Sequence, residues 1–78
     1  MKNAAGILAF GRHVRQLRET RGWSQEVLAD EADIAKPTVQ RIEKGQAAAT
    51  LEVLLSLARA LQVPFGEFMN APGIEAQE

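Results

Sequence analysis

The residues of this chain best able to form specific polar contacts are cationic, and they fall in two segments. Residues 12–21 carry a net charge of +3 and residues 36–45, which contain KPTVQRIEK, carry +2, whereas residues 24–33 between them carry -4. If the two positive segments fold side by side, they form a local basic face, which contact with nucleic acid requires. The net charge of -1 for the whole chain argues against tight non-specific binding, not against binding itself.

No set of residues typical of catalysis or of metal binding accompanies these cations. Cysteine is absent and His13 is the single histidine, so a disulfide or a zinc site of the usual Cys/His kind cannot form. We interpret Ser24 as a helix cap, because no second histidine motif, carboxylate pair or Gly-rich phosphate loop accompanies it. His13 is expected on an exposed helix face without a metal or switch role. The sequence therefore predicts a binding protein without a cofactor, not an enzyme.

Length and composition predict one soluble, cytoplasmic domain. With 78 residues and 46% hydrophobic content, the chain is near the size at which a single core is marginal, which favours oligomers. The apolar run over residues 4–10 is followed by arginines instead of a cleavage site, so we interpret it as the start of a helix. No stretch approaches the roughly 20 apolar residues that span a bilayer, and no membrane partner is expected.

The spacing of apolar residues predicts an all-α chain without strands. The expected helices run over residues 7–21, 25–32, 36–44, 51–61 and 64–69. Ser24 and Thr50 are suitable N-caps, and Gly45 is a C-terminal stop. Asp33 must end the second helix in the left-handed conformation, which aspartate tolerates better than most residues. Residues 70–78 are expected to form a frayed, flexible tail beyond a domain of residues 1–69.

The second and third predicted helices, with the short turn between them, form a helix-turn-helix candidate. Ala29 matters most for this arrangement, because a larger side chain there would hold the two helices apart. The residues that must be small or apolar where the helices cross have the required register: Leu28, Ala29, Ala32, Ile34, Val39 and Ile42.

From Phe10 to about Met69 the chain resembles the Xre/Cro family of helix-turn-helix regulators, the phage-repressor type. The stretches that carry the resemblance are FGRHVRQLR from residue 10, GWSQE from residue 22, LA at residues 28–29, RIEKG from residue 41 and TLEVL from residue 50. The resemblance implies a compact five-helix, lambda-repressor-like domain. It also implies a sequence-specific transcriptional regulator, most simply a repressor, that binds a pseudo-palindromic operator in double-stranded DNA as a homodimer.

By the family pattern, Gln25 at the start of the second helix would hold a DNA phosphate, and the third helix would lie in the major groove. The outward positions of that third helix are Ala35, Lys36, Pro37, Thr38, Gln40, Arg41 and Lys44. Lys36 and Arg41 could donate to guanine, and Gln40 could pair with adenine. Thr38 and Lys44 suit contacts with phosphate. A solvated helix face is the alternative for these side chains. The arginines at 12, 15 and 21 are interpreted as such a face, with a second DNA contact as their alternative.

The resemblance also implies that Arg18 pairs with Glu43, which would fix the first helix against the third. Three residue choices depart from the family pattern: Asp33 replaces the usual glycine, Ala35 replaces a Ser or Thr cap, and the loop 46–49 lacks the usual basic residues. The missing cap costs roughly 1 kcal/mol. We therefore expect weak binding per subunit, restored by two subunits whose recognition helices lie about 34 Å apart.

Apolar residues remain once one core is assembled, and they could either close that core or form a dimer interface. They are Val53, Leu57, Phe65, Phe68 and Met69. Two other functions stay open beside the DNA-binding regulator. The protein could be an antitoxin that also masks a protein toxin through this surface, or a controller of restriction-modification genes. It could also be a protein-interaction module without affinity for DNA.

Overall fold

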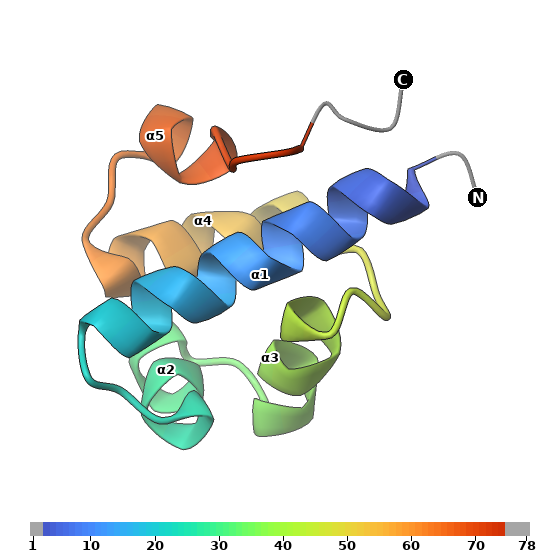
Figure 1. The fold of residues 1–78 in the computed structure, drawn as a ribbon. Helices are drawn as coiled ribbons and strands as arrows, with labels where there is room; N and C mark the ends of the chain where they lie inside the picture. Colours follow the sequence, from blue (N-terminus) through green and yellow to red (C-terminus); the bar gives the residue numbers. More distant parts are fainter. Residues whose placement is uncertain (1–2, 75–78) are drawn as a thin grey trace.

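The computed structural model describes residues 3–74, which form five α-helices and no strand (Figure 1). The helices are α1 (Ala4–Thr20), α2 (Gln25–Ala32), α3 (Lys36–Glu43), α4 (Leu51–Leu61) and α5 (Phe65–Met69). The predicted all-α class and the order of five helices are confirmed. α1 begins at Ala4, three residues before the predicted start at Ile7. The small residues 4–6 form an additional helical turn, which the spacing of larger apolar residues does not reveal.

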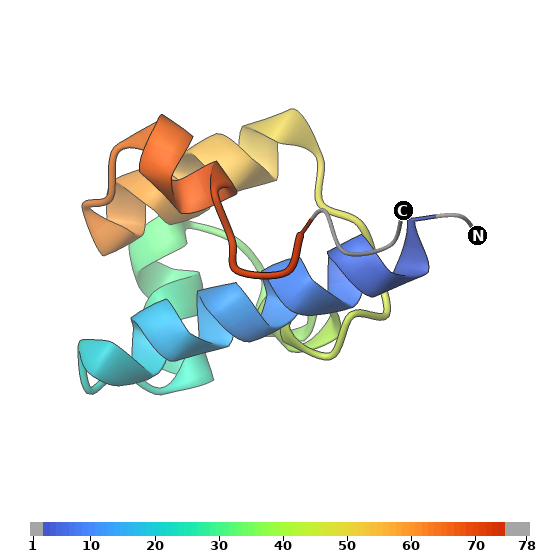
Figure 2. The ribbon, with the colours of Figure 1, turned by 45° about the horizontal axis from the view of Figure 1, so that its top comes forward.

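The longest helix, α1, crosses the whole molecule and organises the others. It packs mainly on α3, while α2 packs on both α3 and α4, and α4 packs on α5. α2 and α3 lie below α1 in Figure 1, and α4 lies behind it. After α5 the chain returns along α1 towards the N-terminal end of that helix (Figure 2). None of the helices over residues 3–74 is both long and apolar enough to cross a membrane.

All five helices contribute side chains to one core. At its centre the rings of Phe10 and Phe68 meet edge to face, with centroids 5.2 Å apart. The buried apolar residues are Phe10, Val14, Leu28, Ala29, Ala32, Val39, Ile42, Leu57, Ala58, Leu61, Phe68 and Ala71. The crossing of α2 and α3 therefore buries the small residue Ala29, as its spacing predicts.

The helix ends follow the local sequence closely. Ser24 accepts a hydrogen bond from the Val27 amide, and Thr50 caps α4 in the same way. Asp33 has a φ of 56°, in the left-handed region, and closes the turn between α2 and α3. Ala35 begins α3 without a side-chain cap.

The structure corrects the apolar faces that the sequence predicted for α4 and α5. Leu57 and Phe68 were candidates for a dimer interface, but both are fully buried in the core and cannot form one. The other three candidates, Val53, Phe65 and Met69, are half-buried against the same core. Leu51 and Leu55 of the same helix, in contrast, are exposed. Because α2 packs on α4 from one side, the inward face of α4 is rotated towards Leu57.

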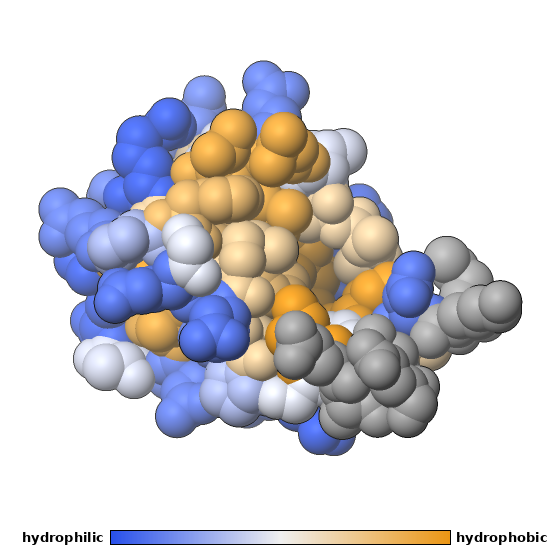
Figure 3. Space-filling view, turned by 90° about the horizontal axis from the view of Figure 1, so that it is seen from above, coloured by the Kyte–Doolittle hydropathy of each residue, from blue (hydrophilic) through white to orange (hydrophobic). Residues whose placement is uncertain are grey.

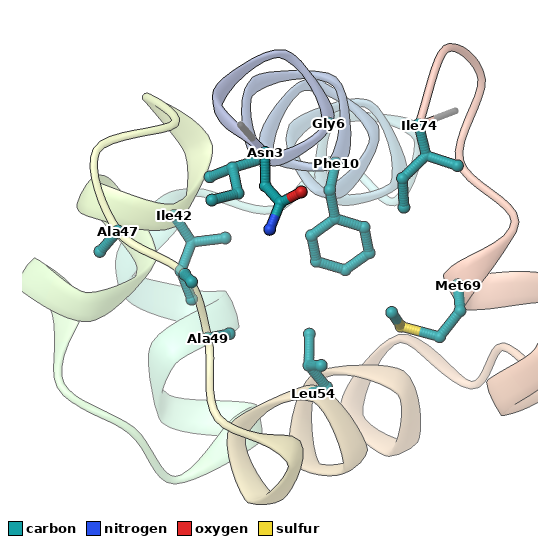
Figure 4. Close-up of a pocket in the computed structure, with 11 residues that line it drawn as sticks. Asn3, Gly6, Phe10, Ile42, Ala47, Ala49, Leu54, Met69 and Ile74 are labelled. Carbon is teal, nitrogen blue, oxygen red and sulfur yellow. The ribbon is translucent and has the colours of Figure 1, made fainter. Parts of the chain in front are cut away.

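The first part of the expected tail packs on the domain. Ala71 is buried and Ile74 contacts the core, whereas residues 75–78 lie outside the described residues. Ile74 and Met69 line one side of an apolar hollow of about 240 Å³ between α1, α4 and the loop that precedes α4 (Figure 4). The small side chains of Ala47 and Ala49 leave this space open.

His13 is not the exposed residue that the sequence predicted. Its ring lies beside the rings of Phe10 and Phe68, with centroids 6.2 Å from each, and its Nε2 atom is buried without a hydrogen-bond partner. The returning segment covers this side of α1, because Pro72 and Gly73 line the same hollow as His13.

Candidate nucleic-acid interface

The outward side of α3 carries the polar residues that the sequence assigned to DNA. Val39, Ile42 and Glu43 are buried, so helical geometry directs the remaining side chains away from the core. Five of the assigned residues on or beside α3 are exposed: Ala35, Lys36, Pro37, Arg41 and Lys44. Thr38 and Gln40 are half-buried at the flanks of this surface. Lys36 and Gln40 are four residues apart and are therefore neighbours along the surface of the helix. Pro37 and Arg41 form a second such pair beside them.

A buried ion pair fixes α3 against α1. The Arg18 Nε and one terminal nitrogen donate to the two carboxylate oxygens of Glu43, at 2.7 and 3.0 Å. Such a bidentate pair is planar and strongly directional. The other terminal nitrogen of Arg18 donates to the Trp23 carbonyl oxygen at 2.8 Å. The hydrogen bond with Glu43 raises the pKa of Arg18 above its usual value, so the guanidinium keeps its charge despite burial.

Gln25, expected to contact DNA, is also part of this network. Its Nε2 donates to Glu43 Oε1 at 3.0 Å. The side chain of Glu43 therefore holds α1 through Arg18 and the N-terminus of α2 through Gln25. One amide hydrogen and the amide oxygen of Gln25 remain for another partner. The sequence indicated the ion pair and the amide separately, but only the structure shows that they share one carboxylate.

A polar hollow opens beside this network, where the N-terminus of α2 meets the C-terminal end of α3. Arg15 and Lys44 line it together with Ser24, Gln25 and the Arg18–Glu43 pair. Two cations beside a helix N-terminus suit an anion such as a phosphate. Arg15 was interpreted as part of a solvated face, and it also forms an exposed ion pair with Glu19 at 3.0 Å. The +3 charge of residues 12–21 was the signal that could have identified it.

Gly11 allows α1 and α3 to approach closely, a role that the sequence did not reveal. A methyl group at this position would overlap the Ile42 carbonyl oxygen and would lie 3.0 Å from the Glu43 carbonyl oxygen. These are backbone atoms, so they cannot move aside as a side chain can. The C-terminal end of α3 therefore rests directly on the backbone of α1, next to the ion pair.

Comparisons with known proteins agree with this arrangement. Residues 14–68 match a family described as helix-turn-helix. The HTH-type transcriptional regulator SutR of Escherichia coli (strain K12) is 35% identical over 72 residues, which are 92% of this chain and 39% of that protein. The chain thus spans about two fifths of the length of that relative.

Two solved structures are similar in fold. The restriction-modification controller protein C.AhdI from Aeromonas hydrophila has a TM-score of 0.77 and 35% identity, over 80% of this chain and 94% of that one. The clp gene regulator ClgR from C. glutamicum has a TM-score of 0.75 and 22% identity, over 82% and 83%, and shows the fold alone. With a family match over residues 14–68, this lambda-repressor-like chain belongs to the Xre/Cro-type helix-turn-helix family.

Proposed function

We propose that this chain is a sequence-specific DNA-binding transcriptional regulator that reads one operator half-site with α3 in the major groove. The observation that carries the proposal is the Glu43 network, which holds Gln25 and the C-terminal end of α3 together while the outward side of α3 stays uncovered. In this function the buried side of α3 fixes its orientation, and the exposed side is free to contact bases.

Each residue of the surface has a distinct role in this proposal. Lys36 and Arg41 donate to guanine O6 and N7, and Gln40 pairs with adenine. Thr38 and Lys44 contact phosphate, as does Gln25 through its remaining amide hydrogen. Ala35 and Pro37 have no polar side-chain group and supply the close apolar contact that such a groove-filling helix needs. The chemistry required is binding alone, so no catalytic role is included.

The protein acts as a homodimer on a pseudo-palindromic operator, most simply as a repressor that covers a promoter. One subunit offers few cations, and the loop 46–49 contains only glutamine and alanine. Two subunits on adjacent half-sites double the contacts and supply the missing affinity. The name of the E. coli relative supports the broader function, transcriptional regulation.

The test is fluorescence anisotropy with the DNA upstream of the protein's own gene and with a scrambled duplex. We expect tighter, salt-sensitive and cooperative binding to the upstream DNA. Arg41→Ala should cost roughly 1–3 kcal/mol and relax preference at one base pair. Gln25→Ala, the matched control, should weaken binding to both duplexes by the same factor. Unchanged affinity and base preference in Arg41→Ala would show that α3 is not the reading helix.

A controller of restriction-modification genes is the second candidate, favoured by the 35% identity to C.AhdI over nearly the whole of that protein. Such a controller is also a DNA-binding transcriptional regulator, but its operator lies upstream of an endonuclease or methyltransferase gene. Sequencing the neighbourhood of the gene distinguishes the two candidates. An adjacent toxin gene would instead support the antitoxin alternative, in which a protein toxin is a further partner.

A further inference from the structure

The outward side of α4 carries apolar side chains that the core does not use. Leu51 is 63% exposed and Leu55 is 47% exposed, the highest values among the large apolar residues of the described chain. They are four residues apart and therefore lie one above the other on the helix. Figure 3, which looks down on α4 and α5, shows an apolar patch over this part of the molecule. Neighbouring exposed leucines on a helix are typical of an interaction surface.

Two charged residues flank this apolar pair in an order that is complementary to itself. Glu52 lies in the first turn of α4 and Arg59 lies in the last turn. At a spacing of seven residues they share one side of the helix, two turns apart, with Leu55 between them. Both are exposed, and among residues 3–74 neither has an ion-pair partner within 4.0 Å.

An antiparallel copy of the same helix would match both features. If two α4 helices cross at the midpoint between Leu55 and Ser56, Glu52 of each copy faces Arg59 of the other. The same arrangement brings the two Leu55 side chains together at the centre. A two-fold interface requires such a self-complementary surface, because every contact occurs twice.

The flanking elements suit a dimer that must face one duplex. α2 packs below α4 and α5 lies above it, so the outward stripe points away from the core between them (Figures 1 and 2). A two-fold axis through the stripe, perpendicular to α4, keeps α2 and α3 of both copies on the same side. The molecule is 22–23 Å wide across its two shorter axes, and α3 lies on the side away from α4. The two copies of α3 would then lie farther apart than the two molecular centres, as half-sites about 34 Å apart on one face of a duplex require.

We propose that two copies of this chain associate through the outward side of α4, with Leu55 at the centre and Glu52 of each copy paired with Arg59 of the other. This surface replaces the α4 and α5 residues that the sequence suggested, of which two are buried in the core. The proposal rests on the proposed function for its purpose, because such a dimer presents two copies of α3 to one operator.

Charge-swap rescue measured by sedimentation equilibrium of the full chain, without DNA, tests this surface. Glu52→Arg and Arg59→Glu each place like charges opposite one another twice per dimer, so each should raise the dissociation constant of the dimer at least about tenfold. The double variant restores opposite charges and should return to within about threefold of the unmodified chain. Leu55→Gln should abolish association, whereas Val27→Gln, at a similarly exposed position on α2, should leave it unchanged.

Two further measurements keep the result clear. Thermal unfolding followed by circular dichroism must show that all variants fold, because both swaps place charges unfavourably in the helix dipole of α4. Anisotropy with a single half-site duplex measures monomer binding and should not change in Glu52→Arg. Failure of the double variant to restore association, or a monomeric chain at all concentrations, overturns the proposal. Retained half-site binding in that case leaves the proposed DNA-binding function intact.

Discussion

At the scale of single residues, Glu43 accepts hydrogen bonds from two other elements, from Arg18 on α1 and from Gln25 on α2. It is buried although it belongs to the polar stretch RIEKG, and only 3% of its side chain is exposed. A charged residue in such a place is stable only because its partners replace the lost water. The position of the proposed reading helix therefore depends on one carboxylate.

The first prediction concerns this carboxylate. Glu43→Gln removes the bidentate partner of the buried Arg18 guanidinium and leaves it only the exposed Glu19 carboxylate, 4.0 Å away, as a counter-charge. We expect a loss of about 3–5 kcal/mol in the free energy of unfolding. Urea unfolding followed by circular dichroism measures it. Glu19→Gln is the control, because this exposed carboxylate pairs with Arg15 at 3.0 Å and approaches Arg18 only to 4.0 Å, so its loss should cost less than about 1 kcal/mol. Equal losses in the two variants would contradict the role given to Glu43.

At the scale of elements, the packing of α1 on α3 depends on the absence of a side chain at Gly11. We expect Gly11→Ala to destabilise the domain by at least about 1–3 kcal/mol, because the added methyl group forces two backbones apart. It should also weaken DNA binding, since α3 would shift with its backbone. Thermal unfolding and anisotropy measure the two effects.

Gly66→Ala is the control for that prediction. Gly66 lies on α5, and a methyl group there would meet no atom within 4 Å. Alanine is the better helix former, so this variant should be unchanged or more stable by up to about 1 kcal/mol. A similar loss of stability in both variants would mean that glycine is needed at residue 11 for a reason other than close packing.

The elements also show what the sequence could and could not predict. Ser24 and Thr50 set the starts of α2 and α4 correctly, because a cap depends only on neighbouring residues. Gln62 ends α4 in the left-handed conformation, with a φ of 58°, although its type gives no signal for it. The inward face of α4 was misassigned for a related reason. Apolar residues surround more than half of this helix, so only the packing of α2 and α5 decides which of them are buried.

The same limit applies to the candidate site. The ion pair between Arg18 and Glu43 followed from the family resemblance, and the structure contains it. The contact from Gln25 to the same carboxylate required the angle between α2 and α3, which no local pattern encodes. The close approach at Gly11 depends on Ile42 and Glu43, about thirty residues later in the sequence, and a glycine in a helix has no single meaning in a sequence.

At the scale of the whole molecule, the net charge of -1 limits binding that depends on phosphate alone. The surface around α3 offers four exposed cations per subunit, which are Arg15, Lys36, Arg41 and Lys44. We therefore expect log K against log salt to have a slope no steeper than about -4 per subunit. Anisotropy between about 50 and 200 mM salt measures this slope. A slope near zero would favour a protein-interaction module instead, because such a module has no phosphate contacts to lose.

The order in which the helices pack has a consequence for synthesis of the chain. α1 finds its main contact in α3 rather than in its neighbour α2, and α2 needs α4 as well as α3. A nascent chain that has released only α1 and α2 from the ribosome therefore has no core to bury. The helix pair that carries the proposed reading surface becomes stable only once α4 has emerged, so the first four helices must wait for one another and fold together after that point.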